Sequence, residues 1–517
     1  MKKCKCGYYP TIIIPGIGQS KVDVCTPAGE RVKTVWPIDI DEKELVKKIA
    51  PAAAKMMVTR KDGEFLEVLK SAVKDIVSDL AVNSEGVPVE YLKPVDYDGQ
   101  PVGRCAPEDR GYIYRMVPME ELGEQIGEDH LYFFSYNSFG QPYETAKDLH
   151  NYIQNVKEQT GHDKVNIVPV SLGGSIATAY FDMYGDLDDI HRVCYFVPAA
   201  NGSTLIADIL DGKVDLDSPE ELFGFLLNRK TTETIVKLSK YMPKDGLRHI
   251  AETLLNTVLD DVIVNCPGMW AVVPKERYEA LAEKYLQGYG KGMLKAKTER
   301  FYRAQCDLKN ILEKQAKKGV EIFSICGYNR QLVPIIKSDV NSDTVVDFKS
   351  ASLGGYALPL GETFPDDYKC EKPNCKNKKH NHISPERTVD LSTSIFPDRV
   401  FCFSGQQHDD TAYNDVALMV SKEILTNDDF KDVYSDPRFP QFNGSRNIRK
   451  LKYDLLPKAE ELLELDLHER VLHILENAVE DGKAVFDETL IENNDKASEA
   501  TKKLYEAVRL AQPEYIK

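Results

Sequence analysis

The chain of 517 residues has no long apolar run, because no uninterrupted stretch approaches the roughly 18 residues that a membrane-spanning helix needs. The first apolar segment, from Thr11 to Ile14, is too short for the core of a signal peptide. No basic tract long enough for nucleic-acid recognition is present, and the formal net charge of −16 predicts an acidic surface that repels nucleic acid and anionic membranes unless charge is locally segregated. We therefore expect a cytoplasmic protein without a transmembrane segment and without a nucleic-acid partner.

The cysteines do not suggest a disulfide framework, since there are 11 of them, an odd number. Cys194, Cys326 and Cys402 fall within apolar runs that predict buried strands. Reduced thiols behave as small apolar residues in such places. We therefore expect these three cysteines to be part of the core.

Predicted strands alternate with predicted helices along the chain, which is typical of an α/β fold with a mostly parallel central sheet flanked by helices. With 42% apolar residues, the chain can bury a large core. The strands that short apolar runs predict are Tyr9 to Ile14, Leu131 to Tyr136, Val165 to Val170, Arg192 to Pro198, Glu321 to Cys326 and Arg399 to Ser404.

The most informative segment, Val165 to Tyr180, reads VNIVPVSLGGSIATAY, so a β-branched run passes directly into a serine and then into a helical pattern. This pattern resembles the nucleophile elbow of α/β-hydrolases, in which a sharp turn from strand to helix exposes the nucleophile. Ser171 would be that nucleophile, and the two glycines after Leu172 would let strand and helix approach closely. Pro169 departs from the usual GxSxG pattern, and the alternative is a serine that caps an ordinary buried helix.

A hydrolase of this kind also needs an acid and then a histidine later in the chain. His408 follows the predicted strand Arg399 to Ser404, and a histidine at a strand end can accept the proton of the serine. His380 and His382 are rival bases, but neither follows a strand. The loop after the strand at 321–326 offers the acid, for which we choose Asp343, a carboxylate able to orient the histidine.

Four passages resemble the lipase and acyltransferase branch of the α/β-hydrolases that includes lecithin:cholesterol acyltransferase and related phospholipid acyltransferases. They are the strand and loop Thr11 to Ser20 followed by Trp36-Pro37, the elbow, the segment Cys266 to Pro274, and the loops around Asp343 and His408. The resemblance implies an α/β-hydrolase fold and spans about residues 8–425. Relatives typically read DGxVPxxSA where this chain reads DTVVDFKSA, which leaves the choice of acid open among Asp339, Asp343 and Asp347.

The first loop, Pro15-Gly16-Ile17-Gly18, has a physical interpretation of its own. The amide of Ile17 follows a glycine in a loop that leaves a strand, so it can be the second donor to an oxyanion beside the amide of Leu172. Read alone, the same four residues are a tight turn.

Domain boundaries follow from where the strand pattern stops. Residues 8–202 and 301–428 form the expected hydrolase core, with an insertion at about 38–130. Residues 203–300 carry helical pattern and predict a lid, whose apolar residues between 222 and 242 suit an acyl chain or, alternatively, a plain helical core. Residues 429–517 predict a helical extension for packing or oligomerisation, although the oligomeric state does not follow from the sequence.

A loop rich in lysine brings together four side chains that can bind zinc, namely Cys370, Cys375, His380 and His382. Such a metal could replace a missing hydrophobic core. The spacing is not that of a standard zinc finger, and the alternative is a solvated loop. A structural zinc is thus one of the two interpretations of this loop, and we expect no cofactor for catalysis.

Taken together, these patterns predict a serine-dependent ester hydrolase or acyltransferase that acts on a lipid or other small ester through an acyl-enzyme on Ser171. The competing hypothesis is a catalytically silent protein of the same fold that serves in binding or as a scaffold. Pro169 and the altered acid loop favour that second hypothesis.

Overall fold

A parallel sheet of seven strands forms the centre of the structure, which is a computed structural model. It describes residues 6–38, 42–216, 242–288, 290–333, 335–444, 451, 455–465, 467–484 and 494–511. Every pair of neighbouring strands is parallel. In spatial order the strands are β12 (Phe442–Gly444), β11 (Val400–Ser404), β8 (Glu321–Tyr328), β7 (Ile190–Phe196), β6 (Val165–Pro169), β1 (Thr11–Ile14) and β5 (Leu131–Phe133). The sheet confirms the predicted α/β fold.

Both faces of this sheet are buried, which explains why its strands read as continuous apolar runs. On β1, Ile12 and Ile14 belong to one core and Ile13 to the other. Helices α5 (Pro142–Thr160), α6 (Gly173–Tyr184), α13 (Gly292–Cys306) and α14 (Leu308–Lys317) cover the first face. Helices α3 (Pro107–Met116), α4 (Glu120–Ile126) and α16 (Asp415–Thr426) cover the second.

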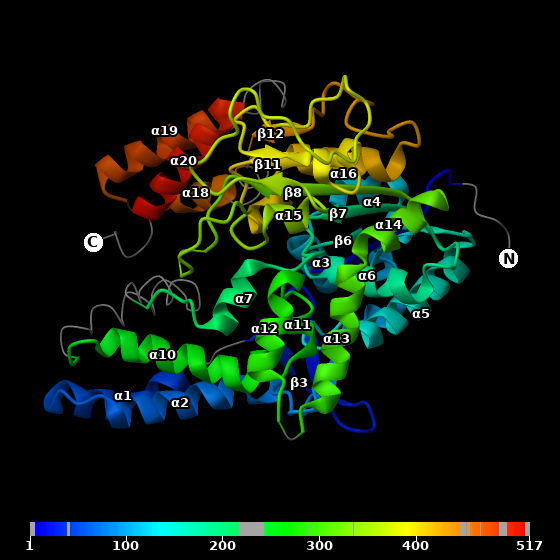
Figure 1. Cartoon of the computed structure of the whole chain (residues 1–517). Coiled ribbons are helices and arrows are strands. Elements are labelled where there is room, and N and C mark those ends of the chain that lie inside the picture. Colours follow the sequence, from blue (N-terminus) through cyan, green and yellow to red (C-terminus); the bar gives the residue numbers. More distant parts are fainter. Residues whose placement is uncertain are drawn as a thin grey trace.

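The two insertions into the core, expected separately at about 38–130 and 203–300, share one hydrophobic cluster. Helices α1 (Glu42–Thr59) and α2 (Gly63–Val77) come from the first, and α7 (Thr204–Asp211) and α10 (Gly246–Val258) from the second. Met56, Leu69, Ile209 and Leu254 are members of this cluster, one from each helix. Figure 1 shows α1, α2 and α10 lying side by side. Residues 217–241 of the expected lid lie outside the described residues.

The expected C-terminal extension is not helical throughout, because β12 at its beginning joins the central sheet. The described helices of the extension, α18 (Leu456–Leu463), α19 (Glu469–Ala484) and α20 (Asn494–Ala511), gather at one side of the molecule (Figure 1). They pack around a core of their own that contains Leu475, Leu504 and Val508. The remaining helices, α11 (Pro267–Trp270), α12 (Lys275–Tyr285) and α15 (Phe348–Ala351), belong to the region between α10 and β11.

Two small antiparallel sheets were not predicted from the sequence. One joins β3 (Arg31–Trp36), β2 (Val22–Cys25) and β4 (Leu92–Pro94), and the other joins β9 (Tyr356–Ala357) and β10 (Val389–Asp390). The first four residues of β3 are exposed, so they lack the apolar signal of a buried strand. Strand β12 was missed for a related reason, since its three residues are only partly buried.

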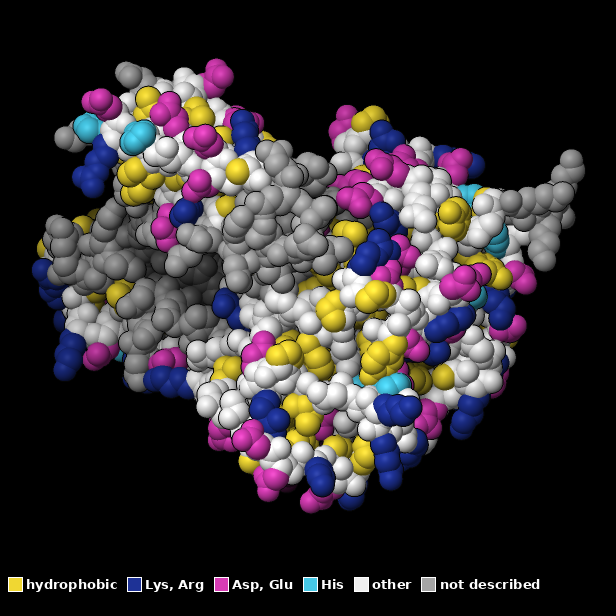
Figure 2. Space-filling view, turned by 90° about the horizontal axis from the view of Figure 1, so that it is seen from above, with side chains coloured by type: hydrophobic (Ala, Val, Ile, Leu, Met, Phe, Trp, Pro, Cys, Tyr) yellow, Lys and Arg dark blue, Asp and Glu magenta, His cyan; other side chains and the backbone are white. Residues whose placement is uncertain are grey.

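Charges of both signs are interspersed over the face of the molecule that Figure 2 shows. Acidic side chains alternate there with lysine and arginine, so the net negative charge does not collect in one part of that face. Within the described ranges, none of the helices combines the length and the apolarity needed to cross a membrane.

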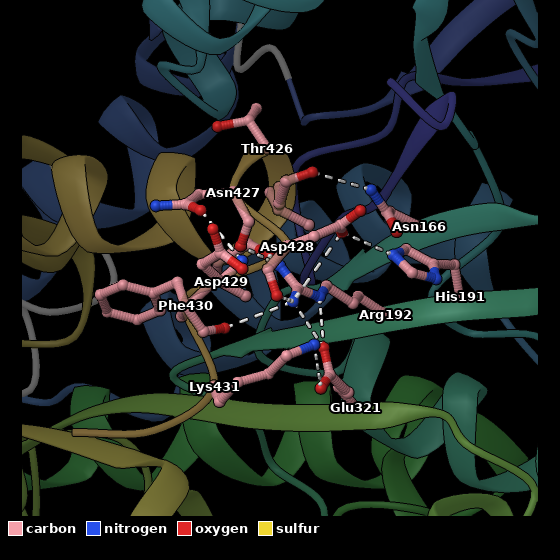
Figure 3. A network of polar contacts seen from close by, with 12 residues as sticks. Asn166, His191, Arg192, Glu321, Thr426, Asn427, Asp428, Asp429, Phe430 and Lys431 are labelled. Carbon is pink, nitrogen blue, oxygen red and sulfur yellow. Dashed lines mark hydrogen bonds and ion pairs between the residues drawn. The ribbon is translucent and has the colours of Figure 1, made fainter. Parts of the chain in front are cut away.

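A fully buried arginine, Arg192, joins the beginning of β7 to the end of α16 (Figure 3). Its Nε donates to Glu321 Oε2 at 2.7 Å, and Lys431 Nζ lies 2.8 Å from the other oxygen of Glu321. Burial raises the pKa of Glu321, but the two cations outweigh this effect and lower it. The guanidinium also donates to the backbone oxygens of Ile424, Asn427, Asp428 and Phe430. A single side chain thus binds carbonyl groups at the end of α16 and in the loop that follows it.

We expect Arg192→Met to lower the free energy of unfolding by about 3–5 kcal/mol, because it leaves Glu321 without its buried partner and several carbonyls unpaired. The matched control is Lys431→Met, which removes a half-exposed cation from the same carboxylate and should cost less than about 1 kcal/mol. Urea unfolding of both variants measures the difference, and equal losses would contradict the role given to Arg192.

Candidate active site

Ser171 lies in the sharp turn between β6 and α6, with a φ of 50° that serine rarely adopts. A strained serine at this point is what a nucleophile elbow requires. The backbone N–H of Ser171 donates to the oxygen of Phe196 on β7 at 3.0 Å. Pro169, the departure from the usual motif, is the last residue of β6 and lies beside Ile14, the last residue of β1.

Close backbone contacts hold the elbow against β1 and the loop after it. A Cβ atom on Gly173 would lie 2.2 Å from the oxygen of Ile14, so no other residue fits there without moving the strand. A Cβ atom on Gly16 would lie 2.9 Å from the Cβ of Ser171. The loop after β1 therefore lies directly against the serine.

The structure brings Ser171, His408 and Asp343 together in one line of hydrogen bonds. His408 Nε2 lies 3.0 Å from Ser171 Oγ, and His408 Nδ1 lies 2.7 Å from Asp343 Oδ2. All three residues are buried, and they follow the carboxyl ends of β6, β11 and β8 respectively. The backbone N–H of His408 also donates to the oxygen of Asp343 at 2.7 Å, so the two loops are joined by their backbones as well.

The carboxylate of Asp343 is held by two backbone donors besides the histidine. Its Oδ1 accepts from the N–H groups of Val345 and Val346 at 3.0 and 2.7 Å. Burial lowers the pKa of His408, but the charge and hydrogen bond of Asp343, with a smaller effect of Asp409, outweigh burial and raise it above the ordinary value of 6.5. The site therefore favours a proton on His408 more than water does.

The other two candidate acids have different surroundings. Asp347 accepts hydrogen bonds from the backbone N–H and the hydroxyl of Thr204, the latter at 2.7 Å, at the start of α7. Burial, with a contribution from the charge of Asp343, raises the pKa of Asp347 to about 6 although Thr204 opposes the shift. The backbone oxygen of Asp339 accepts from the N–H of Leu360. Of the three aspartates, Asp343 is the one that the structure brings to His408.

The amides of Ile17 and Leu172 border the serine from two sides. Leu172 directly follows Ser171, and Ile17 follows the glycine that contacts it. Neither amide donates to an acceptor within the part of the chain that the structure describes. Both are therefore available to an oxygen atom of a bound substrate.

Two residues that the sequence did not single out hold the loop of Ile17 in place. The side chain of Gln19 accepts from the N–H of Gly16 at 2.6 Å and donates to the oxygen of Met116 at 2.8 Å. The hydroxyl of Tyr136 donates to the oxygen of Pro15 at 2.7 Å. Tyr136 was predicted as the end of a strand, whereas β5 ends at Phe133, and neither residue stands in a sequence pattern that marks its contact with this loop.

Three of the four predicted zinc ligands also come together, away from the serine. Cys375, His380 and His382 form a group with Asp398 in which all ligand atoms lie within 4.8 Å of one another. Cys370 is not in this group, and burial raises the pKa of its thiol. His380 and His382 thus face Asp398, while His408 is the histidine in contact with Ser171.

Comparisons with known proteins leave the family of this chain open. Neither a scan of protein-family models nor a search of curated proteins finds a match. Among solved structures, a chain of "The crystal structure of Tle4-Tli4 complex" has 14% sequence identity and a TM-score of 0.27. The match covers 62% of this chain and 75% of that chain. A likeness of this size supports no argument about activity, so the fold class rests on the parallel sheet itself.

The environment of Asp347 predicts an unusual pH dependence of stability. Because its pKa is raised to about 6 in the folded protein, against about 3.9 in an unfolded chain, protonation of Asp347 stabilises the fold as the pH falls through 6 towards 4. The contribution reaches about 3 kcal/mol at most. We expect Asp347→Asn, which keeps an acceptor for Thr204, to be more stable than wild type at pH 7.5 and to lose this gain at pH 4.

Urea unfolding at several pH values measures this difference. The matched control is Asp339→Asn, which removes a carboxylate of the same loop that makes no hydrogen bond to Thr204. An Asp347→Asn variant that is less stable than wild type at pH 7.5 would contradict the prediction.

Proposed function

We propose that this protein is a serine-dependent hydrolase of carboxylic esters, a lipase, esterase or lipid acyltransferase similar to the lecithin:cholesterol acyltransferase group. The observation that carries the proposal is the hydrogen-bonded line from Ser171 Oγ through the His408 ring to Asp343, with distances of 3.0 and 2.7 Å. Its order along the chain, serine, acid and histidine, is that of the α/β-hydrolases.

In the proposed first step, Ser171 Oγ attacks the ester carbonyl while His408 Nε2 accepts its proton. Asp343 stabilises the imidazolium that forms, and it keeps the proton on Nδ1 so that Nε2 is free to accept. His408 then gives its proton to the alkoxide that leaves. The product of this step is an acyl-enzyme on Ser171.

The negative charge that develops on the carbonyl oxygen needs donors that are already in place. The amides of Ile17 and Leu172 are proposed for this role, because both border Ser171 and neither has another acceptor among the described residues. Loss of one such donor typically costs about 3 kcal/mol of transition-state stabilisation. Gln19 and Tyr136 support catalysis indirectly, by holding the loop of Ile17.

The second step transfers the acyl group to water or to another alcohol, with His408 acting as base towards the acceptor. The helical layer of α1, α2, α7 and α10 adjoins the acid loop, because Asp347 binds the start of α7. We propose this layer as the neighbour of an acyl chain bound at Ser171, because it joins the apolar cluster of the two insertions to the loop of Asp343. The same chemistry therefore serves a lipase and an acyltransferase, which differ in the acceptor that this layer admits.

The alternative is a silent binding protein of the same fold. Two sequence features favoured it, namely Pro169 and the altered acid loop. Neither feature distinguishes the two hypotheses, because Pro169 lies at the end of β6 and Asp343 contacts His408. The alternative remains as an outcome of the following test.

We expect a fluorophosphonate probe to label the wild-type protein at one residue, because the probe reacts with a serine that a neighbouring base activates. Labelling should be lost in Ser171→Ala and His408→Ala. Ser175→Ala is the matched control, since this serine lies on α6 one turn from the elbow and only donates to backbone oxygens. Intact-protein mass spectrometry measures the adduct. A folded wild-type protein that is not labelled, with detergent present to open the lid, would favour the silent fold.

The raised pKa of His408 predicts that hydrolysis of a soluble ester falls as the pH drops through a value above 6.5, because a protonated imidazole cannot act as base. In Asp343→Asn the fall of kcat/KM at acid pH should move to lower pH, because burial lowers the pKa of His408 once the charge of Asp343 is gone. The same variant should reduce kcat by about 10⁴-fold. Asp409→Asn, the control, removes a weaker charge and should keep nearly full kcat. Unchanged limbs in both variants would argue against His408 as the base.

A further inference from the structure

A cluster of four side chains with the chemistry of metal ligands lies in the long loop between β8 and β11. Cys375 Sγ is 3.6 Å from His380 Nδ1, which is 2.7 Å from Asp398 Oδ1. The same oxygen of Asp398 is 3.3 Å from His382 Nε2. Cys375, the pair His380 and His382, and Asp398 just before β11 therefore bring three parts of the loop together at one point.

The buried ring of His382 faces this point with an unpaired nitrogen. His382 is 3% exposed, and its Nδ1 lies 2.9 Å from Gln441 Oε1. That oxygen must be the acceptor, because the Gln441 Nε2 donates to the backbone oxygens of Pro397 and Val400. A neutral His382 ring therefore carries its proton on Nδ1, which leaves a bare lone pair on Nε2.

This lone pair points at a carboxylate oxygen, which is also an acceptor. Accordingly, Nε2 of His382 makes no hydrogen bond although Asp398 Oδ1 is 3.3 Å away. A buried acceptor that faces another acceptor is unfavourable unless a cation lies between them. An imidazole that donates from one nitrogen to a fixed acceptor and offers the other to the cluster is also the usual arrangement of a histidine that binds a metal.

We propose that Cys375, His380, His382 and Asp398 bind one zinc ion. Tetrahedral zinc places nitrogen and oxygen ligands about 3.4 Å apart, and sulfur and nitrogen about 3.6 Å apart. The distances of 3.3 Å between His382 and Asp398 and 3.6 Å between Cys375 and His380 match these values. A thiolate and two imidazoles favour zinc over magnesium or calcium, and the thiolate and carboxylate together balance its charge.

Zinc binding requires two local changes. The contact of 2.7 Å between His380 and Asp398 opens by roughly 0.7 Å, and the ring proton of His380 moves from Nδ1 to Nε2. The side chain of Asn377 donates to His380 Nε2 at 2.7 Å when that nitrogen carries no proton. Once Nε2 is protonated, the exposed Asn377 side chain turns away, and the N–H of His380 donates to another acceptor. Cys375 releases its proton to solvent, so one proton leaves per zinc bound.

The position of the cluster points to a structural role. Asp398 and Gln441 precede the first residues of β11 and β12, whereas His408 follows the end of β11. The five residues of β11 span roughly 16 Å, so this zinc lies too far from Ser171 to touch a substrate there. It would instead fasten residues 375–382 to the beginning of two strands at the side of the sheet.

The test uses the full-length protein, free of any affinity tag and prepared with zinc in the medium. After gel filtration against a mild chelator, we expect one zinc per chain in the wild type by elemental mass spectrometry. Cys375→Ser should bind zinc at least tenfold more weakly. Cys370→Ser is the matched control, because Cys370 lies in the same loop outside the cluster, and it should keep its zinc.

A second control addresses another group of possible ligands, in which Cys6 Sγ lies 3.4 and 3.5 Å from Nε2 of His130 and His162. Cys6→Ser should also keep its zinc. Cobalt in place of zinc gives an independent measure, because the absorption band from a thiolate bound to cobalt should be missing in Cys375→Ser and present in both controls. Asp398→Asn serves in the same assays if circular dichroism shows that Cys375→Ser is unfolded.

Three results would overturn the proposal. The first is a wild-type protein that takes up no zinc when titrated in competition with a chromophoric chelator. The second is a loss of zinc from Cys370→Ser or Cys6→Ser as large as that from Cys375→Ser. The third is a folded Asp398→Asn that binds zinc as tightly as the wild type.

Discussion

The close contact between Gly173 and the end of β1 is the constraint on which the candidate site depends. The oxygen of Ile14 occupies the space that any side chain at position 173 would need. Because β1 and β6 are neighbours in the sheet, this contact sets the turn of Ser171 directly beside the loop that leaves β1. The amides of Ile17 and Leu172 can therefore border the same serine without any side chain to position them. Backbone packing thus fixes the turn that carries Ser171, and the hydrogen bonds of Ser171 to Phe196 and His408 hold the residue within it.

The order of the strands brings Asp343 and His408 to Ser171. Since all neighbouring strands are parallel, the loops carrying Ser171, Asp343 and His408 leave the sheet at one edge. Asp343 and His408 come from adjacent strands, and their backbones are joined by a hydrogen bond of 2.7 Å. At the opposite edge, Arg192 fixes the end of α16, the helix that begins shortly after His408. Both ends of the segment that carries the histidine are thus held by buried polar contacts.

The positions of Ser171 and His408 after strands, and six of the seven central strands, were predictable because each depends on a local pattern of apolar residues and a turn. The sequence favoured Asp343 but left Asp339 and Asp347 open, because the three aspartates share one short loop. What separates them is tertiary: two backbone donors and His408 surround Asp343, while Thr204 binds Asp347. The common core of the two insertions joins segments far apart in the chain, so no window of sequence contains it. Asp398 escaped notice for the same reason, since it stands alone before a strand, far from the cysteines and histidines.

The loop between β8 and β11 shows how a long irregular segment can carry a precise group. Its first part, which holds Asp343, is fixed by backbone donors and by the tie between Asp347 and α7. Its later part has little regular structure, and side chains converge there on Asp398 and Gln441. The first part is therefore held at the edge of the sheet that carries Ser171, and the later part is held at the other end of β11. A disturbance at the cysteine and histidine cluster can loosen the later half while Asp343 keeps its contacts, because none of the contacts of Asp343 passes through that cluster.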